Sequence, residues 1–490
     1  MKRLPIIIFA LAAAVGAAAQ QVVHLSLEDA VLRARANSVD AAVALNELRT
    51  SYWEYRTFRA DLLPEASFKA TLPSYQKQYT SYMDEQGNFS FVRTNYLQMN
   101  GELSVTQNIW LTGGTLSLNT SLDFLRQLEG SKYNRFMSIP FALTLNQPIF
   151  GVNTVKWDRR IEPVRYAEAK AQFLTATENV AMTAINYYFN LLMARENVSI
   201  AAQNLANATR LYEVAKEKRA MGQISQNDLL QMELNVLNAQ SGLTDAESNL
   251  KSDMFALRSY LDFGEDVEIV PEIPAVIPAV DVTYEDALDR ALANNKFAKN
   301  LRRRQLEADY AVAKAKGNLR QISLFAQVGY TGTDRIFGHA YEDLRANQVV
   351  QVGVSIPLID WGKRRGQVKV AESNRQVVES RLRQEAMNFN QDLFILVERF
   401  CNQQMQLEIA EKADTIARRR YDTNVETYLI GKISTLDLND SQVKKDESRQ
   451  EYINQLYRYW YYFYQLRSIT LWDYASGTGI DADIDKIVRN

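Results

Sequence analysis

An eight-residue pattern, Gly-x-Ile-Ser-x-x-Asp-Leu, occurs twice in the chain. It starts at Gly222 and again at Gly431, an offset of 209 residues (431 minus 222). The same offset pairs Pro148 with Pro357. Each copy is far longer than the unit of a solenoid protein and contains several kinds of element. The chain is therefore predicted to consist of two structural repeats.

The two copies share a helical pattern. Apolar residues step alternately by four and three positions, which is the spacing of a coiled-coil seam. The first series is Val180, Ala184, Tyr187, Leu191, Ala194, Val198, Ala201, Leu205, and the second, interrupted once by Gln403, is Phe389, Leu393, Leu396, Phe400, Leu407, Ala410. As one helix, the 58 residues from Val164 to Met221 would be about 87 Å long. Each repeat is predicted to contain a long antiparallel helical hairpin, with its tip at 222 or 431.

Shorter segments alternate apolar and polar residues, which is typical of strands with one apolar face. These segments are 68–72, 97–105, 116–124, 139–145 and 350–356. Residues 75–96 and 329–347 are predicted to be long exposed loops, and 112–114 a short turn. Long loops at one end and short turns at the other are typical of outer-membrane barrels. A soluble sandwich with one buried face is the alternative.

Three aromatic residues, Trp110, Phe150 and Trp361, lie at the turn ends of the predicted strands. In a barrel, an interfacial girdle of aromatic side chains would occupy this position. As isolated residues they could equally belong to a core.

The order of segments follows from these patterns. Residues 1–19 have the basic start, apolar run and small-residue end of a secretory signal, so the chain is predicted to be exported. The first repeat is predicted over 20–263, a Pro-rich linker over 264–282, the second repeat over 283–475 and a C-terminal tail over 476–490. Each repeat would contain a helix of roughly 35 residues capped by Ser26 or Thr283, strands at about 65–149 or 322–357, and a hairpin.

Composition argues against several classes of function. With 56 basic and 58 acidic residues, the net charge of -2 gives no reason to expect nucleic acid as a partner. The two His residues and the single Cys401 offer no metal-ligand spacing and no catalytic constellation. No catalytic residue, cofactor or resident metal is therefore expected, and the chain is predicted not to be an enzyme.

One chain offers too few strands to close a barrel alone, so subunits would have to share one. At this point the sequence resembles the TolC-like outer-membrane efflux proteins, also called outer membrane factors. The resemblance rests on the duplicated order of helix, strands and hairpin, on Pro148 and Pro357 at strand exits, and on the two Gly-x-x-Ser-x-x-Asp-Leu tips. It implies a mixed α and transmembrane β fold. A homotrimer would share a β-barrel in outer-membrane lipid, continued by an α-helical coiled-coil tunnel into the periplasm of a Gram-negative bacterium.

The resemblance also implies a function. The chain would be the passive exit duct of a tripartite efflux or type I secretion system, recruited by a periplasmic adaptor and an inner-membrane pump of RND or ABC type. The alternatives are a periplasmic coiled-coil adaptor or structural protein without a pore, a porin, and an exported enzyme. The alternating segments argue against the adaptor, and the small number of strands argues against the porin. The lack of a catalytic group of residues argues against the enzyme.

Roles at the tips come from the same resemblance. Asp437 and Asp440 would form an acidic ring at the periplasmic entrance, where three copies of each carboxylate attract divalent cations. Asp437 is equally well placed to cap a helix. Tyr428 and Asp228 would form a latch that holds the entrance shut. The residues expected to dock the adaptor, unless they serve turn geometry alone, are Gly222, Ile224, Ser225, Gly431, Ile433 and Ser434.

The first repeat departs from the family pattern. Its alternation predicts four strands, whereas the family usually has two at this position. The extra pair would either enlarge the barrel beyond the usual twelve strands or lie outside it.

Overall fold

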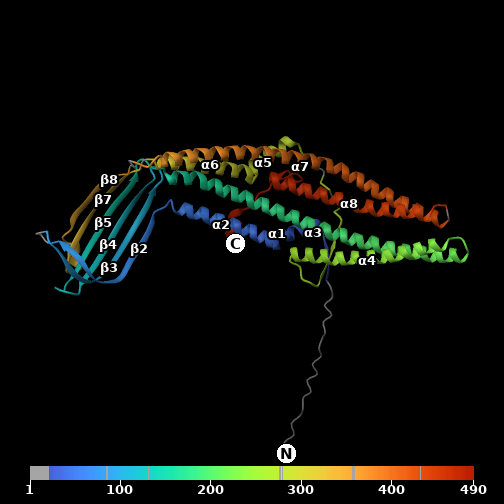
Figure 1. The fold of residues 1–490 in the computed structure, drawn as a ribbon, viewed down its shortest axis with the longest axis horizontal. Coiled ribbons are helices and arrows are strands. Elements are labelled where there is room, and N and C mark those ends of the chain that lie inside the picture. Colours follow the sequence, from blue (N-terminus) through green and yellow to red (C-terminus); the bar gives the residue numbers. More distant parts are fainter. Residues whose placement is uncertain are drawn as a thin grey trace, which may run out of the picture. The chain divides into compact units, whose positions relative to one another are not determined.

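The computed structural model describes most of the chain, and Figure 1 labels its helices and strands. The described residues are 21–83, 87–130, 132–274, 277–278, 280–319, 321–355, 359–430 and 432–489. The predicted signal segment 1–19, together with Pro357 and Gly431, lies outside them.

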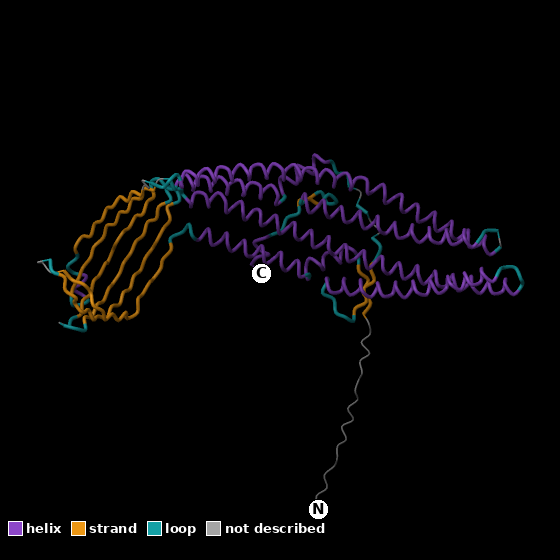
Figure 2. The backbone as a smooth tube through the Cα atoms, in the orientation of Figure 1, coloured by secondary structure: helices purple, strands orange, loops and turns teal. Residues whose placement is uncertain are grey.

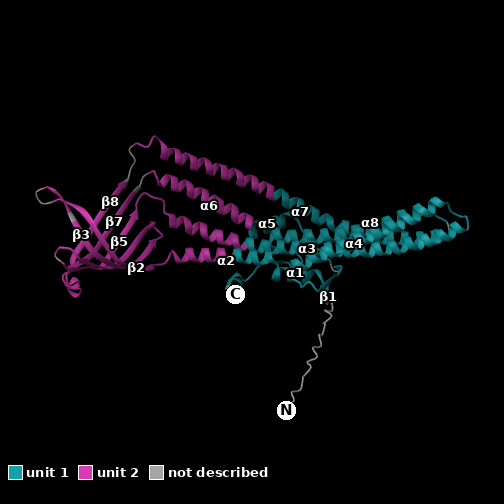
Figure 3. Ribbon diagram, turned by 60° about the horizontal axis from the view of Figure 1, so that its bottom comes forward, with its two compact units in different colours: residues 1–47, 171–295, 390–490 teal, residues 48–170, 296–389 magenta. Residues whose placement is uncertain are grey.

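The chain forms two compact units, and each takes segments from both repeats (Figure 3). The helical unit consists of Met1–Glu47, Ala171–Asn295 and Asn390–Asn490. The sheet unit consists of Leu48–Lys170 and Lys296–Phe389. The duplication in the sequence therefore does not produce one compact unit per repeat.

The sheet unit contains one six-stranded antiparallel sheet, with its strands side by side in Figure 2. Its order is β2-β3-β4-β5-β7-β8. The strands are β2 (Glu65–Met83), β3 (Phe89–Ile109), β4 (Gly114–Gln127), β5 (Asn134–Pro148), β7 (Gln321–Asp334) and β8 (Arg345–Ser355).

One face of this sheet is apolar. The register aligns Val105, Leu118, Leu143 and Val328 in a row across four strands. The last three of these side chains are exposed, although burial of apolar surface is favourable in water. An extended apolar face that the chain leaves uncovered marks a surface that meets lipid or another protein.

The opposite face is polar, and its side chains bond to one another. The Asn100 amide donates to the Asp123 carboxylate at 2.8 Å. The Ser104 hydroxyl donates to the Asn119 amide oxygen at 2.6 Å. Cross-strand pairs of this kind help to hold β3 against β4.

The strands are longer than the alternation predicts. Residues 75–83 and 89–96 continue β2 and β3, and 329–334 and 345–347 continue β7 and β8, so both predicted long loops were wrong. Tyr, Thr and Phe side chains favour strands even where apolar and polar residues do not alternate. The short turn at 112–114 is confirmed, because Gly113 has φ +76° and its N–H donates to the Ile109 carbonyl at 2.7 Å.

Each predicted 35-residue helix is in fact two helices, so the prediction of one continuous helix was wrong. The first is α1 (Leu27–Asn37) followed by α2 (Val39–Ala60). The second is α5 (Tyr284–Asn294) followed by α6 (Lys296–Gly317). At each junction one residue, Ser38 or Asn295, is extended. The Ser38 hydroxyl accepts the Ala41 N–H at 3.2 Å, which starts the next helix.

The long helices are α3 (Thr154–Ala220) and α7 (Lys363–Leu429), both of 67 residues. Most of the predicted seam is buried, including Leu191 and Leu393. None of the helices in the described ranges combines the length and apolar composition that a membrane-spanning helix needs. The return helices are α4 (Gln226–Tyr260) and α8 (Thr435–Thr470). The smaller elements are β1 (Gln21–Leu25), β6 (Val267–Pro271), β9 (Trp472–Asp473), β10 (Thr478–Gly479), α9 (Ile484–Arg489) and the 3-10 helix η1 (Gly338–Tyr341).

The element starts locate the extra strand pair. Helices α1 and α5 begin 257 residues apart (284 minus 27), whereas α3 and α7 begin 209 apart (363 minus 154). The first repeat is therefore 48 residues longer (257 minus 209) between its first helix and its hairpin. This surplus corresponds to β2 and β3, which join the sheet rather than lie outside it.

A buried carboxylate connects three helices of the helical unit. Glu178 on α3 is 1% exposed and lies 2.5 Å from Arg35 on α1 and 3.1 Å from Arg467 on α8. Arg467 also pairs with Asp473 at 3.0 Å. A buried charge is tolerated only when it is paired in this way.

We expect Glu178→Ala to destabilise the helical unit by about 3–5 kcal/mol, because two guanidinium groups would lose their buried partner. Urea unfolding of the detergent-purified protein, followed by circular dichroism, measures the change. The control is Glu247→Ala on the exposed surface of α4, which should change stability by no more than about 0.5 kcal/mol. Equal unfolding midpoints for the two variants would contradict the structural role of Glu178.

Candidate functional site

The two hairpin tips are the candidate site, and both belong to the helical unit. At the first tip, Gly222 has φ +74° and the Gln223 N–H donates to the Lys218 carbonyl at 2.9 Å. This geometry ends a helix in the way glycine favours. Ser225 then caps α4: its hydroxyl accepts the Asp228 N–H at 3.1 Å, and the Asp228 carboxylate accepts the Ser225 N–H at 3.0 Å.

The second tip repeats the cap. The Ser434 hydroxyl accepts the Asp437 N–H at 3.2 Å, and the Asp437 carboxylate accepts the Ser434 N–H, also at 3.2 Å. The Lys432 N–H donates to the Thr427 carbonyl at 3.1 Å, as its counterpart does in the first tip. The repeated sequence pattern is therefore a pair of reciprocal helix caps.

These caps affect the charge of the tips. Hydrogen bonds from Ser434 hold the pKa of Asp437 below its usual value, and Ser225 does the same for Asp228. Both carboxylates are exposed and stay ionised at neutral pH. The capping role considered for Asp437 is therefore present, while its place in an entrance ring stays a prediction.

The other predicted ring residue has a different partner. Asp440 on α8 pairs with the Arg420 guanidinium on α7 at 2.8 Å. Both side chains are about half exposed, so solvent screens this ion pair and a competing ion can reach it.

The predicted latch residues come close together without bonding to each other. The Tyr428 ring lies 5.3 Å from the Lys218 ammonium on α3, measured to the ring centre. Burial raises the pKa of Tyr428, and the nearby Asp228 carboxylate adds to the effect. The hydrogen bonds that the structure records for Asp228 go to Ser225. The latch stays a prediction.

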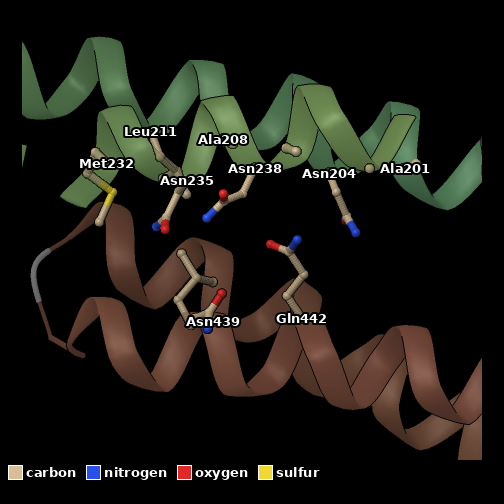
Figure 4. A pocket seen from close by; sticks show the side chains of 12 residues that line it. Ala201, Asn204, Ala208, Leu211, Met232, Asn235, Asn238, Asn439 and Gln442 are labelled. Atoms are coloured by element: carbon tan, nitrogen blue, oxygen red, sulfur yellow. The ribbon is translucent and has the colours of Figure 1, made fainter. Parts of the chain in front are cut away.

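A cavity of about 460 Å³ separates the α3–α4 hairpin from α8 (Figure 4). Five of the twelve residues in its wall have carboxamide side chains. They are Asn204, Asn235, Asn238, Asn439 and Gln442. Polar contacts connect the hairpins beside it: Asn204 donates to Asp446 at 2.7 Å, and Asn207 donates to the Tyr421 hydroxyl at 2.8 Å.

Sequence reasoning missed these contacts. Their partners are more than 200 residues apart in the chain, and no local pattern links them. Farther from the tips, Arg449 pairs with Glu196 at 2.7 Å and adds another bond between the hairpins. Polar groups therefore make many of the contacts that hold the two hairpins together.

Exposed apolar side chains at the tips were also missed. Leu436 is 77% exposed, and Met221 and Ile430 are nearly as exposed. Met221 and Ile430 each directly precede a repeated glycine, a signal that was available in the sequence. The predicted docking residues Ile224 and Ile433 are half-buried, and Ser225 and Ser434 serve as caps.

The three predicted girdle residues lie in the sheet unit, next to the strand ends from which the helices leave. Trp110, Phe150 and Trp361 are all exposed, and Trp361 is 96% exposed. The Arg159 guanidinium lies 4.1 Å from the centre of a Trp110 ring. Their contact with lipid stays a prediction.

Throughout the described part of the chain, no three His, Cys, Asp or Glu side chains are grouped so that they could hold a metal ion. The tips offer exposed carboxylates and exposed apolar side chains.

Comparison with known proteins assigns the family. The sequence model of one family, described as "Outer membrane efflux protein", matches residues 30–262 and 287–470. The chain belongs to the outer membrane efflux protein family. No curated protein sequence matches it.

Solved structures of other channels have the same fold. The Campylobacter jejuni CmeC outer membrane channel is 16% identical, with a TM-score of 0.63 over 94% of this chain and 88% of that one. The Vibrio cholerae outer membrane protein VceC is 14% identical, with a TM-score of 0.63 over 93% and 97%. The open state of the Neisseria gonorrhoeae MtrE channel is 14% identical, with a TM-score of 0.57 over 94% and 90%.

Membership confirms the TolC-like resemblance and the predicted fold class of a β-barrel with a long helical tunnel. It places the protein in the outer membrane, extending into the periplasm. Efflux proteins of this family are transport ducts that work with adaptor and pump partners, so the chain is a channel and not an enzyme. The number of subunits remains a prediction.

We expect Ser434→Ala to loosen the first turn of α8 by about 1 kcal/mol, because the cap loses its hydroxyl. The pKa of Asp437 is lowered in the folded tip, so its stabilising effect is complete above the ordinary Asp pKa of about 4. The effect is lost as pH falls through the lowered value. Amide hydrogen exchange of α8 measures the loosening. Ser448→Ala, in the middle of α8, is the control, and equal protection in both variants would contradict the cap.

Proposed function

We propose that this efflux protein is the exit duct of a tripartite efflux or type I secretion system. It works as a homotrimer, gated at its periplasmic end and recruited by an adaptor and an inner-membrane pump. The sheet is the main observation that supports this proposal. Each chain supplies six strands with one apolar and one polar face, and six strands are too few to enclose a pore alone. An adaptor without a pore would have no use for an uncovered apolar sheet face.

The gate is proposed at the hairpin tips because the contacts there can be exchanged for water. The bond of Asn207 to the Tyr421 hydroxyl is polar but part-buried, because Tyr421 is only 7% exposed. The ion pair of Arg420 with Asp440 is about half exposed, so solvent reaches it. Replacing such bonds by water costs little net free energy, so two arrangements of the hairpins can be close in stability. In a trimer, Asp437 and Asp440 would then form a ring that attracts divalent cations.

Docking of the adaptor is proposed at the apolar rim of the tips. Met221, Ile430 and Leu436 expose large apolar side chains around the two caps. An adaptor hairpin with matching apolar residues would bury this surface. The predicted docking residues Gly222, Ile224, Ser225, Gly431, Ile433 and Ser434 would shape the surface rather than supply most of its area.

Single-channel recording in planar bilayers, with the oligomer mass measured on the same detergent-purified sample, tests the function. We expect a trimer of small conductance that divalent cations block from one side. Asp437→Ala combined with Asp440→Ala should raise the conductance and weaken the block, because the entrance loses its carboxylates. Arg420→Ala should strengthen the block, because it leaves Asp440 unpaired.

The control for these recordings is Asp245→Ala, an exposed carboxylate in the middle of α4 that should change neither quantity. Unchanged conductance and block in the double variant would reject the acidic ring but not the duct. A monomer that never inserts would reject the duct and favour the adaptor alternative.

The latch is tested separately at Tyr428. If its hydroxyl holds the entrance shut, Tyr428→Phe should shift the open-to-closed ratio about fivefold, the equivalent of one hydrogen bond of about 1 kcal/mol. Tyr428→Ala should shift the open-to-closed ratio by no more than Tyr428→Phe does. If instead only the Ala variant opens the channel, the ring contact with Lys218 is responsible and the hydroxyl latch is wrong. Tyr452→Phe on α8 is the control.

A further inference from the structure

If β2 and β3 lay outside the barrel, β4 would be the edge strand that meets another subunit. In this chain, β3 already occupies that edge of β4. Fourteen register pairs join β4 to β3, from Tyr96 with Gln127 to Ile109 with Gly114. The bonds of Asn100 to Asp123 and of Ser104 to Asn119 reinforce this pairing on the polar face. A second copy could bind to β4 only by breaking the whole ladder.

The open edges of the sheet are β2 and β8. Among the described residues, β2 pairs only with β3, and β8 pairs only with β7. In a membrane, an unpaired strand edge leaves N–H and C=O groups without partners, at a cost of several kcal/mol for each group. Both edges must therefore be covered where the sheet meets lipid.

The two edges have matching faces. On β2, Phe68 lies in the apolar row with Leu103 and is exposed, while Lys69 lies opposite Glu102 on the polar face. On β8, Val350, Val352 and Val354 are exposed on the apolar face. Placed side by side, the strands would continue both the apolar and the polar face without interruption.

Strand direction permits this contact. Every pair of neighbours in the sheet is antiparallel, and the sheet has six strands, so β2 and β8 run in opposite directions. Placing β8 of one copy beside β2 of the next therefore keeps the alternation. The contact is head-to-tail, and contacts of this kind form a ring when the rotation from copy to copy closes.

We propose that each copy joins its β2 to β8 of the next copy, so that the trimer encloses eighteen strands instead of the usual twelve. The count rests on the proposed trimer. The joined part of β2 is Glu65–Thr71, because the bulge that follows contains Pro73, which has no N–H to donate. The inserted β2–β3 pair is thus a pore-widening element and an intersubunit contact.

A wider barrel changes what the outer-membrane end can pass. Barrel diameter grows roughly in proportion to strand number, so eighteen strands give a diameter about 1.5 times that of twelve. The helical entrance, rather than the barrel, would then limit the size of the cargo that can pass. Such a duct suits bulky cargo, such as large amphiphiles or polypeptides, better than a twelve-stranded one.

Disulfide trapping between copies tests the contact. The native Cys401 is first removed by Cys401→Ser, so that each variant contains only the introduced cysteines. All introduced positions lie on the polar face, and several are combined so that different registers between copies can be trapped. The β2 substitutions are Ser67→Cys and Lys69→Cys, the β8 substitutions are Val349→Cys and Gln351→Cys, and the matched β4 substitutions are Ser117→Cys and Asn119→Cys.

We expect oxidised β2–β8 double variants to run at two and three times the mass of one chain on non-reducing gels. Single variants and β4–β8 double variants should remain at the mass of one chain. Cross-linking of β4 to β8 would overturn the proposal and place the β2–β3 pair outside a twelve-stranded barrel. A trimer that forms no cross-link with either set would also overturn it.

The native mass of every variant keeps the two proposals separate. If the protein is a trimer but β2 and β8 do not cross-link, the eighteen-stranded barrel fails and the duct survives. If the protein is not a trimer, the strand count and the proposed duct fail together.

Discussion

The unpaired backbone at the two edges of a six-stranded sheet is the constraint on which this structure depends. A strand edge in lipid needs a hydrogen-bonding partner, and nothing in the described part of the chain provides one for β2 or β8. A single chain is therefore incomplete as a membrane protein. In the proposed assembly, other copies would complete the wall, and lipid would cover its apolar face, of which Leu118 and Leu143 form part.

Polar interactions have two different roles in the helical unit. Glu178 is buried and paired on two sides, so any change there leaves a charge without compensation. Toward the tips, the ion pair of Arg420 with Asp440 is about half exposed, so water can replace either partner. Polar pairs thus hold the helices together near Glu178, whereas the exposed pair near the tips adds little net stability. This difference is what a gate at the end of a long hairpin requires.

Much of the fold was predictable because its signals are local. The repeated glycine pattern located both tips, and the steps of four and three located the long helices. The breaks at Ser38 and Asn295 were missed because a single extended residue hardly disturbs a helical pattern. The outer parts of β2 and β3 were missed because their Tyr and Thr residues were interpreted as part of a long exposed loop.

The candidate site was less accessible to sequence reasoning. The Ser434–Asp437 cap could be predicted, since both residues belong to one short pattern. The pairing of Arg420 with Asp440, and the contacts of Asn204 and Asn207 with the second hairpin, depend on how distant segments pack. The place of the inserted strands was also open until the register showed β3 bonded along β4.

The position of the insertion explains how a sheet can widen without disturbing the entrance. The 48 extra residues precede β4, so the long helices and the tips that follow keep the 209-residue correspondence between repeats. Both long helices consequently have 67 residues, and Lys218 meets Tyr428 at nearly equivalent distances from the two tip glycines. An added pair of strands, unlike a single strand, also preserves antiparallel alternation around a closed ring. In the proposed barrel, the added strands would therefore widen the membrane pore while the spacing of the tip residues stays the same.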